Sequence, residues 1–465
     1  MIADQGPTRI ERDTLGEMAV PADALYGAQT ARAVANFAIS GWRMPDRFIT
    51  ALARIKAAFA RAHGDAGALP AEVAGAIAAA AEAVAAGAHR EQFPVDVFQT
   101  GSGTSSNMNV NEVVARLAAR ALGAGHPPVH PNDDVNRGQS SNDVIPAAIR
   151  LAVAGSWRDE TRPALVAVAE ALRGLAREHG STVTLGRTHL MDAVPTTYGR
   201  TFEAWARRVD DALARGDAAA AGLLRLPLGG TAVGTGIGVA PGTVARVVAE
   251  LRRVTGLEVE ADAVPAVGIA AQDSAIAFAD VLAGAGRALA AVANDLRLRA
   301  SGPFGGFGEL QLPAVQPGSS IMPGKINPVI PEAVVQAAMQ VEGLAAACRA
   351  SATLHQLELS HANPLLAWNL DTMCRLLAGA GRALVARCLD GLTVDTGRAA
   401  TLASRSPALA TALAGRIGYE RAAEVARQAA ATGATVAEVA RRLAVLPEAE
   451  LDELLDLARL AGTDR

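Results

Sequence analysis

Residues 140–178 read SSNDVIPAAIRLAVAGSWRDETRPALVAVAEALRGLARE. The first four residues, Ser140–Asp143, all have side chains that cap helix N-termini well, and an apolar run follows them at once. This pattern predicts one helix over residues 143–178. Because helices in globular proteins average about 10 to 14 residues, a helix of this length points to an elongated bundle.

Four more amphipathic segments of comparable length support a bundle of long helices. Composition favours the same architecture, because half of the residues are apolar, only 3% are aromatic, and alanine is the best helix former. A glycine-rich stretch at 226–238 interrupts the pattern and predicts a loop. The sequence therefore predicts an all-α fold. The four segments lie near residues 195–222, 271–300, 328–352 and 364–391.

The chain of 465 residues is longer than one ordinary domain, so two or three domains are expected. The pattern divides it into a mostly helical N-terminal domain (1–140), a central long-helix domain (141–394) and a small C-terminal helical domain (395–465). Charged residues make up 19%, below the usual quarter. Surplus apolar helix faces must be covered, which predicts an oligomer.

Charge and cysteine usage exclude several classes of function. The net charge is −4 and arginines are scattered among acids, so no nucleic-acid-binding surface is expected. No phosphate-binding loop or dinucleotide fingerprint occurs. Cys348, Cys374 and Cys388 match no metal spacing and predict buried free thiols in a reducing compartment. With no signal peptide and no uncharged apolar run of membrane-spanning length, we expect a soluble, cytoplasmic protein without membrane partners.

The stretch from Gly318 to Pro331, GSSIMPGKINPVIP, looks least helical and carries the most chemistry. Its glycines permit backbone angles closed to other residues, and its prolines disfavour helix, so a loop is predicted. Only two of the 43 basic residues are lysine, Lys56 and Lys325, and the second lies in this loop. An ammonium is a compact point charge, which suits a small anion better than a planar guanidinium. The alternative is an ordinary surface loop.

Four clusters combine small hydroxyl or amide side chains with glycines, at or just before a predicted helix start. Helix N-termini offer unpaired N–H groups and partial positive charge, so they attract anions. Together the clusters predict a small substrate that is anionic at more than one end, most simply a dicarboxylate. Each cluster alone could be plain helix capping. They are Gly101–Asn107, Ser140–Asp143, Thr188–His189 and residues 318–327.

Three titratable residues have open alternatives. His189 has no histidine or cysteine at ligand spacing, which favours proton handling over metal binding. Glu332 falls in the first turn of a predicted helix, where it either complements the helix dipole or pairs with an imidazole. His130 lies in His-Pro-Asn-Asp and is either a turn residue or a secondary anion contact.

Six motifs, in this order, resemble the fumarase/aspartase superfamily from about Arg9 to about Ala440, and class II fumarase within it. The motifs are Gln99-Thr-Gly-Ser-Gly-Thr-Ser-Ser-Asn-Met-Asn, His130-Pro-Asn-Asp-Asp-Val-Asn, Ser140-Ser-Asn-Asp, Gly186-Arg-Thr-His-Leu-Met-Asp-Ala, Leu228-Gly-Gly-Thr-Ala-Val-Gly-Thr-Gly and Gly318-Ser-Ser-Ile-Met-Pro-Gly-Lys-Ile-Asn-Pro.

The resemblance implies a three-domain, all-α homotetramer with a 20-helix core and active sites shared by three subunits. It implies that Ser319 abstracts a proton next to a carboxylate, that Lys325 and Asn327 stabilise the resulting dianion, and that His189 paired with Glu332 activates water. No metal or organic cofactor is implied. The implied substrate contacts are Ser102, Thr104, Ser140, Ser141, Asn142, Thr188 and Ser320, and the implied second anion site is His130, Asn132 and Asp133.

Some positions separate fumarase from aspartase. Thr100, Ser102 and Ser141 favour fumarase, whereas Pro328-Val-Ile-Pro-Glu and Gln356-Leu-Glu-Leu look like aspartase. We therefore expect reversible hydration of fumarate to L-malate, with an ammonia-lyase on aspartate or a substituted succinate, or a non-catalytic relative, as alternatives. The chain departs from the family pattern at Gly238, Phe304 and Ser360-His361, which puts substrate choice in question.

Overall fold

The computed structural model describes residues 7–463. These residues form two compact units, each assembled from three separate segments of the chain. Unit 1 contains the described residues of Met1–Pro163, together with Ala214–Gly284 and Met339–Leu377. Unit 2 contains Ala164–Leu213, Ala285–Ala338 and the described residues of Ala378–Arg465. The three-domain division by chain order stays a prediction.

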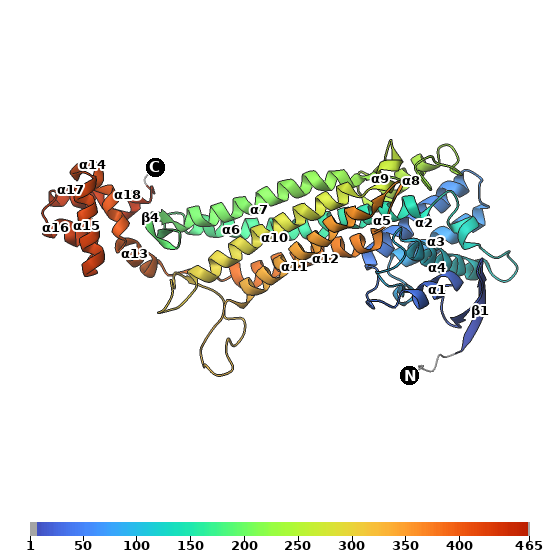
Figure 1. Cartoon of the computed structure of the whole chain (residues 1–465), viewed down its shortest axis with the longest axis horizontal. Helices are drawn as coiled ribbons and strands as arrows, with labels where there is room; N and C mark the ends of the chain where they lie inside the picture. The colour runs from blue at the N-terminus through green and yellow to red at the C-terminus, as the bar shows by residue number, and fades with distance from the viewer. Residues whose placement is uncertain (1–6, 464–465) are drawn as a thin grey trace. The chain divides into compact units, whose positions relative to one another are not determined.

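All five predicted long segments are helical, which confirms the expectation of a mostly α fold (Figure 1). The first is continuous but contains a π-helical turn at Trp157–Thr161. Ser140 caps it, because its hydroxyl accepts from Asn142 N while the Asp143 carboxylate accepts from Ser140 N. The long helices are α5 (Ser141–Ser156), α6 (Arg162–Glu178), α7 (Tyr198–Ala221), α10 (Asp273–Arg299), α11 (Val329–Ser351) and α12 (Asn363–Leu384).

Close packing of these helices depends on small residues and on a few polar bridges. In unit 2, a Cβ on Gly381 of α12 would lie 3.2 Å from the carbonyl oxygen of Ala164 in α6, so the two helices nearly touch. In the same unit, Trp205 Nε1 of α7 donates to Asp295 Oδ2 of α10 at 3.2 Å. The alanine- and glycine-rich composition thus allows backbones to approach closely.

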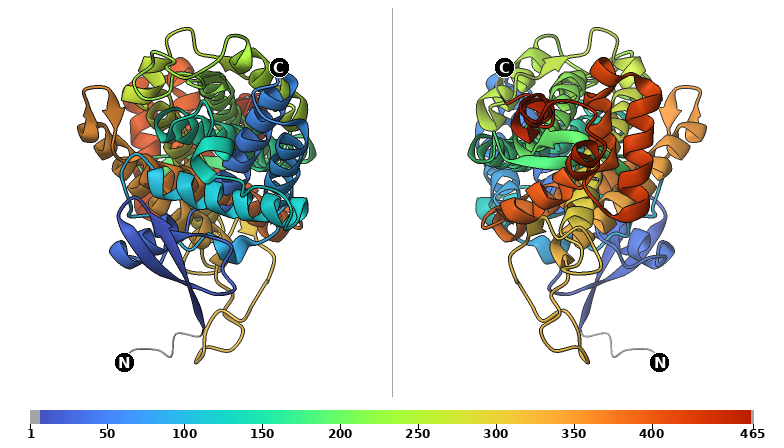
Figure 2. Two further views of the ribbon diagram at one scale, coloured as in Figure 1. Left: turned by 90° about the vertical axis from the view of Figure 1, so that its right-hand side faces the viewer. Right: turned by 90° about the vertical axis from the view of Figure 1, so that its left-hand side faces the viewer.

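The N-terminal part of unit 1 begins with an antiparallel hairpin of β1 (Thr8–Asp13) and β2 (Gly16–Pro21), which contacts α1 (Figure 2). The sequence analysis did not predict this hairpin. The hairpin buries little, so its apolar alternation is weak, and the Arg9 guanidinium holds it by donating to carbonyl oxygens such as those of Pro21 and Tyr26.

Unit 1 also contains further helices, of which α3, α4 and α8 pack on α2. A short connection separates α2 from α3, and α4 begins just after the glycines of the Gly101–Asn107 cluster. The helices are α1 (Ala28–Asn36), α2 (Asp46–Asp65), α3 (Ala71–Ala85), α4 (Thr104–Leu122), α8 (Thr243–Thr255) and α9 (Pro265–Ala270).

The helices after residue 394 are short, as predicted, and enclose a small core of their own (Figure 2, red). Leu413, Val425 and Val436 at its centre are fully buried. The helices are α13 (Thr396–Ser404), α14 (Ala414–Ile417), α15 (Tyr419–Thr432), α16 (Val436–Arg442), α17 (Glu448–Leu454) and α18 (Leu457–Leu460).

The remaining regular elements are short connections. The two-stranded pairs are β3–β4, β5–β6, β7–β10 and β8–β9, and only β5–β6 is parallel. The strands are β3 (Val183–Thr188), β4 (Met191–Thr197), β5 (Arg225–Leu226), β6 (Glu260–Ala261), β7 (Leu310–Gln311), β8 (His355–Gln356), β9 (Leu359–Ser360) and β10 (Thr393–Val394). Short 3-10 or π-helical turns lie at Arg90–Gln92, Pro131–Val135, Gly222–Leu224, Ala352–Leu354, Val385–Leu389 and Pro407–Ala412.

The three cysteines are buried, as expected, whereas one helix is apolar enough to need a closer look as a membrane span. Cys348, Cys374 and Cys388 are free and buried, and burial raises the pKa of each thiol to about 12. Within residues 7–463, α10 alone is long and apolar enough to cross a membrane by length and composition. More than half of its most apolar window, 56%, is buried inside the protein, and core helices pass the same test.

Candidate functional site

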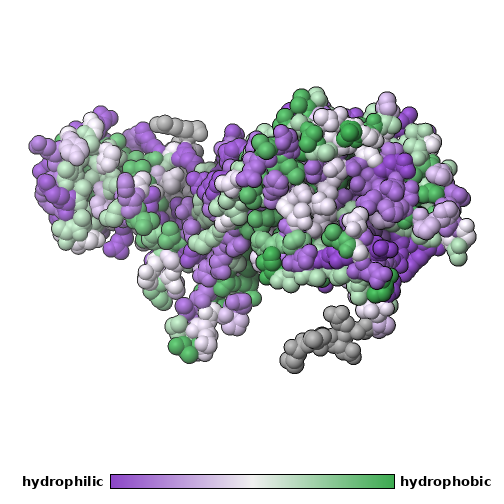
Figure 3. Space-filling model, turned by 45° about the vertical axis from the view of Figure 1, so that its right-hand side comes forward, coloured by the Kyte–Doolittle hydropathy of each residue, from purple (hydrophilic) through white to green (hydrophobic). Residues whose placement is uncertain are grey.

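The loop between β7 and α11 contains Ser319 and Lys325 and is closed by a narrow neck. Gly318 N donates to Lys325 O at 2.9 Å, and Asn327 Nδ2 donates to Gly318 O at 2.5 Å. A Cβ at position 318 would lie 2.3 Å from Lys325 O, so only glycine fits there. The neck confirms the predicted loop and gives Gly318 and Asn327 a structural task. In Figure 3 the loop projects from the surface of unit 2.

Inside the loop, the Ser319 hydroxyl oxygen receives two backbone hydrogen bonds. Ile321 N donates to Ser319 Oγ at 3.2 Å and Met322 N donates at 3.0 Å. Donors aimed at an oxygen stabilise its anionic form more than its neutral form. The loop therefore favours loss of the Ser319 proton, as a general base requires.

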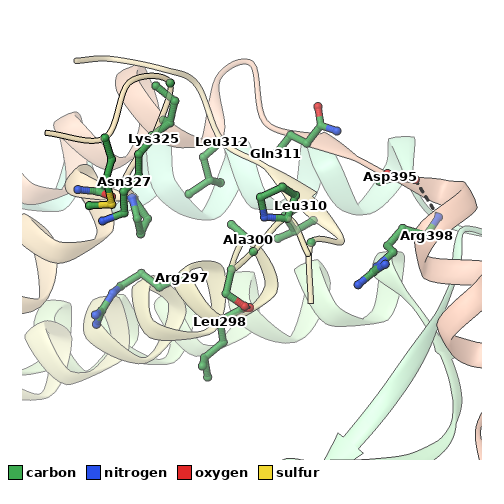
Figure 4. Close-up of a pocket in the computed structure, with 18 of the residues that line it drawn as sticks. Arg297, Leu298, Ala300, Leu310, Gln311, Leu312, Lys325, Asn327, Asp395 and Arg398 are labelled. Carbon is green, nitrogen blue, oxygen red and sulfur yellow. Dashed lines mark hydrogen bonds between the residues drawn. The ribbon is translucent and has the colours of Figure 1, made fainter. Parts of the chain in front are cut away.

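The Lys325 ammonium is exposed and, among residues 7–463, makes no hydrogen bond or ion pair. It lies on the wall of a cavity of about 1250 Å³ in unit 2, with Asn327 and Arg297 nearby and Asp395 and Arg398 farther along (Figure 4). A solvent-facing ammonium beside an amide can receive a carboxylate without first breaking another contact. Ser320 lies in the same loop and is exposed.

Thr188 and His189 lie at the tip of the β3–β4 hairpin, also in unit 2. The expectation that this cluster precedes a helix is wrong, because His189 and Leu190 adopt φ values of 55° and 62° in a tight turn between antiparallel strands. The turn leaves the imidazole free of any hydrogen bond in the described part of the chain.

Glu332 lies in the first turn of α11, as predicted, where its charge suits the helix dipole. Within the described residues of this single chain, no hydrogen bond or ion pair joins Glu332 to His189. The predicted pairing of these two residues therefore stays a prediction.

A buried ion-pair cluster around Glu309, which the sequence analysis missed, joins the β3–β4 hairpin to β7 in unit 2. Glu309, which directly precedes β7, is fully buried and accepts from Arg187 Nη1 at 2.8 Å and from Thr184 Oγ1 at 2.9 Å. Burial, followed by the Glu309 charge, raises the pKa of neighbouring Tyr198 to about 12. Glu309 thus ties the hairpin of His189 to the strand that leads into the Ser319 loop.

Replacing Glu309 by glutamine is expected to lower the free energy of unfolding by about 3 kcal/mol, because the mostly buried Arg187 guanidinium loses its counter-charge. Urea denaturation followed by circular dichroism measures this loss. Glu424→Gln removes a solvent-accessible partner of Arg427 and should change the stability little. Equal losses in the two variants would contradict a structural role for Glu309.

The other polar clusters belong to unit 1. Gly103, in a left-handed conformation with φ 84°, precedes α4, and the hydroxyls of Ser102 and Thr104 lie 3.0 Å apart. Helix capping is confirmed for Ser140, and Asn142 Nδ2 donates to Ala232 O at 2.8 Å. The predicted substrate contacts of these residues stay predictions.

Asp143 organises the N-terminus of α5 and was not singled out as a partner of a distant loop. Its buried carboxylate accepts from Ser140 N and also from Gly229 N and Thr231 N, both at 3.0 Å. Burial raises the pKa of Asp143 to about 6, and these donors oppose the rise. The glycine-rich loop predicted at 226–238 is thereby fixed to the serine-rich helix start.

His130 fits the turn alternative, because its Nδ1 accepts from Asp133 N at 3.1 Å. His130 and Asn132 also line a cavity of about 920 Å³, so the second anion site stays a prediction. Within residues 7–463, no group of three or more His, Cys, Asp or Glu side chains is placed to hold a metal ion.

The chain is similar to known proteins over most of its length. A family described as Lyase matches residues 16–343, and one described as Fumarase C C-terminus matches residues 409–462. A class II fumarate hydratase of Xylella fastidiosa is 47% identical, over 97% of this chain and 95% of that protein. The chain belongs to the class II fumarate hydratase family.

Solved structures agree with membership of the class II fumarate hydratase family. The class II fumarase of Schistosoma mansoni has a TM-score of 0.96 at 31% identity, covering 99% of this chain and all of that chain. A fumarate lyase/delta crystallin from Brucella melitensis, bound to cobalt, has a TM-score of 0.93 at 43% identity, covering 98% of this chain and all of that one.

Proposed function

We propose that the protein is a lyase that catalyses the reversible hydration of fumarate to L-malate. The observation that carries this proposal is the Ser319 hydroxyl, which is held by two backbone N–H groups in the same loop as the exposed Lys325. Such a loop suits abstraction of a proton from a carbon next to a carboxylate. The similar proteins are fumarate hydratases, which indicates fumarate, a small unsaturated dicarboxylate, as the substrate.

In the dehydration direction, Ser319 starts as the alkoxide and His189 starts protonated, and the Ser319 oxygen takes a proton from the carbon next to one carboxylate of malate. The electron pair of the broken C–H bond moves into that carboxylate, which becomes a dianion. Lys325 and the loop amides stabilise the added charge. The C–O bond on the neighbouring carbon then breaks, and water leaves with a proton from His189, so atoms and charge balance.

In the hydration direction the same groups act in reverse. His189 takes a proton from water as the C–O bond forms, and a carboxylate partner such as Glu332 would raise the basicity of its imidazole. The hydroxyl and amide groups of unit 1, at Thr104 and Ser140–Asn142, would hold the second carboxylate. No metal or organic cofactor enters these steps.

We further propose a homotetramer in the cytoplasm, with each active site formed by three subunits. The distribution of polar clusters supports this assembly, because no hydrogen bond or ion pair joins His189 to Glu332 within the described part of one chain. Exposed apolar side chains on the long helices, such as Met339 at 68% exposure, provide surface for subunit contacts. Release of ammonia from aspartate is not favoured, since the relatives named above are fumarate hydratases or fumarate lyases.

The absorbance of fumarate tests the proposed reaction directly. Purified protein is mixed with L-malate and, separately, with L-aspartate, and formation of fumarate is followed in the ultraviolet. We expect fumarate from malate and none from aspartate. Fumarate from aspartate alone would replace the proposal with an ammonia-lyase, and no product from either acid would contradict it.

A further inference from the structure

We propose that Lys56 is a positioning residue for the substrate-binding start of α5, an inference that rests on the function proposed above. Lys56 and Lys325 are the only two lysines in a chain whose other basic side chains are arginine. Lys56 lies in α2, has an exposure of 0%, and plays no part in the steps described so far. Its ammonium donates to Asn136 Oδ1 at 2.8 Å and to Gln139 Oε1 at 3.0 Å.

The two amides that Lys56 holds belong to the segment immediately before Ser140. Asn136 Nδ2 donates to Gln139 O at 3.1 Å, and Gln139 Nε2 donates to Val135 O at 3.0 Å, so the segment forms a closed turn. Because one ammonium binds the side-chain oxygens of both Asn136 and Gln139, the turn fixes the backbone that leads into the start of α5.

A second connection reaches α5 from the side. Asn107 Nδ2 of α4 donates to Asn136 Oδ1 at 3.2 Å and lies 3.4 Å from Ser141 Oγ. Asn136 Oδ1 therefore receives donors from both Lys56 and Asn107. The chain of contacts runs from Lys56 through Asn136 and Asn107 to Ser141, whose hydroxyl is proposed to contact a substrate carboxylate.

An ammonium fits this place better than the other basic side chains. The site supplies two amide oxygens to a side chain that is itself fully buried, and Lys56 offers compact donors there, whereas a guanidinium is larger and has five N–H groups to satisfy. Burial lowers the pKa of Lys56 to about 7, and the charge of nearby Asp143 partly offsets the fall. Removing the ammonium leaves Gln139 Oε1 without a donor and leaves Asn136 Oδ1 with the donor from Asn107 alone.

Lys56 belongs to unit 1, whereas Ser319 and Lys325 belong to unit 2. A disturbed α5 start should therefore weaken substrate binding more than it slows proton abstraction. In the full-length enzyme, Lys56→Met is expected to raise KM for malate and fumarate about tenfold or more while kcat changes less than about threefold. Arg61→Met removes a partly exposed cation from the same helix and should leave both constants unchanged.

The dissociation constant for succinate, a saturated four-carbon dicarboxylate that cannot react, gives a readout independent of turnover. Isothermal titration should show about tenfold weaker binding to Lys56→Met than to wild type or Arg61→Met. Gln139→Met, which keeps the ammonium and removes one of its acceptors, replaces Lys56→Met if that variant does not fold, with the same expected direction.

Each outcome decides the positioning role. A folded Lys56→Met or Gln139→Met variant with wild-type KM and wild-type succinate affinity overturns it, and so does a loss confined to kcat. Wild-type protein that binds succinate but turns over neither malate nor fumarate contradicts the proposed function alone, because the succinate titrations still measure the effect of Lys56.

Discussion

Ser319→Ala is expected to lower kcat for malate dehydration by about 100-fold to 10⁴-fold. Alanine removes the oxygen that receives the Ile321 and Met322 N–H groups, and with it the proposed base. KM should change little, because the neck of the loop at Gly318 does not involve the Ser319 side chain. Steady-state kinetics in both directions measure the effect.

The matched control for this variant is Gln316→Ala, which shortens an exposed side chain of the same loop and should retain wild-type kcat. Circular dichroism and size-exclusion chromatography of both variants establish that fold and assembly are kept. If Ser319→Ala turns over malate at a rate near wild type, another group takes the proton and the proposed mechanism is wrong.

Lys325→Arg is expected to lower kcat/KM by about 100-fold to 1000-fold, although it conserves the charge. The ammonium is a small charge with donors in all directions, whereas a guanidinium is planar and extends farther from the backbone. In the loop it would place its charge beyond the position where the dianion forms. Kinetics with malate over a wide concentration range separate the loss into its KM and kcat parts.

Stability should not explain the loss in Lys325→Arg, because the Lys325 side chain is exposed and makes no hydrogen bond in the described part of the chain. Thermal unfolding of this variant is expected to match wild type. Lys325→Met, which lacks the charge, should be at least as impaired. Near-normal kcat/KM in the arginine variant would show that charge alone is sufficient at this position.

The long helices could be predicted from the sequence because their amphipathic pattern persists over many turns and their starts carry capping residues. The loop at 318–331 could also be predicted, since glycine and proline act locally on the backbone. The β3–β4 hairpin around His189 was missed, because its turn contains no glycine and His189 and Leu190 themselves take positive φ values.

The supports of the site could not be predicted, because they join residues that are far apart in sequence. Asp143 accepts from backbone groups at 229 and 231, and Glu309 accepts from Thr184 and Arg187. No local spacing encodes such pairs. The rarity of lysine was visible in the sequence, yet only the fold shows that Lys56 is buried beneath the helix start.

The hydrogen bonds at Gly318 hold the loop closed, and the side chains inside the loop take no part in them. Two hydrogen bonds close it at its base, and the residues between them contribute nothing to those bonds except the carbonyl of Lys325. The side chains inside the loop can therefore be changed without loss of the two hydrogen bonds that close it. Substitutions at positions such as 320 or 321 should therefore leave both closing bonds and the start of α11 unchanged, although they alter the side chains that the loop presents.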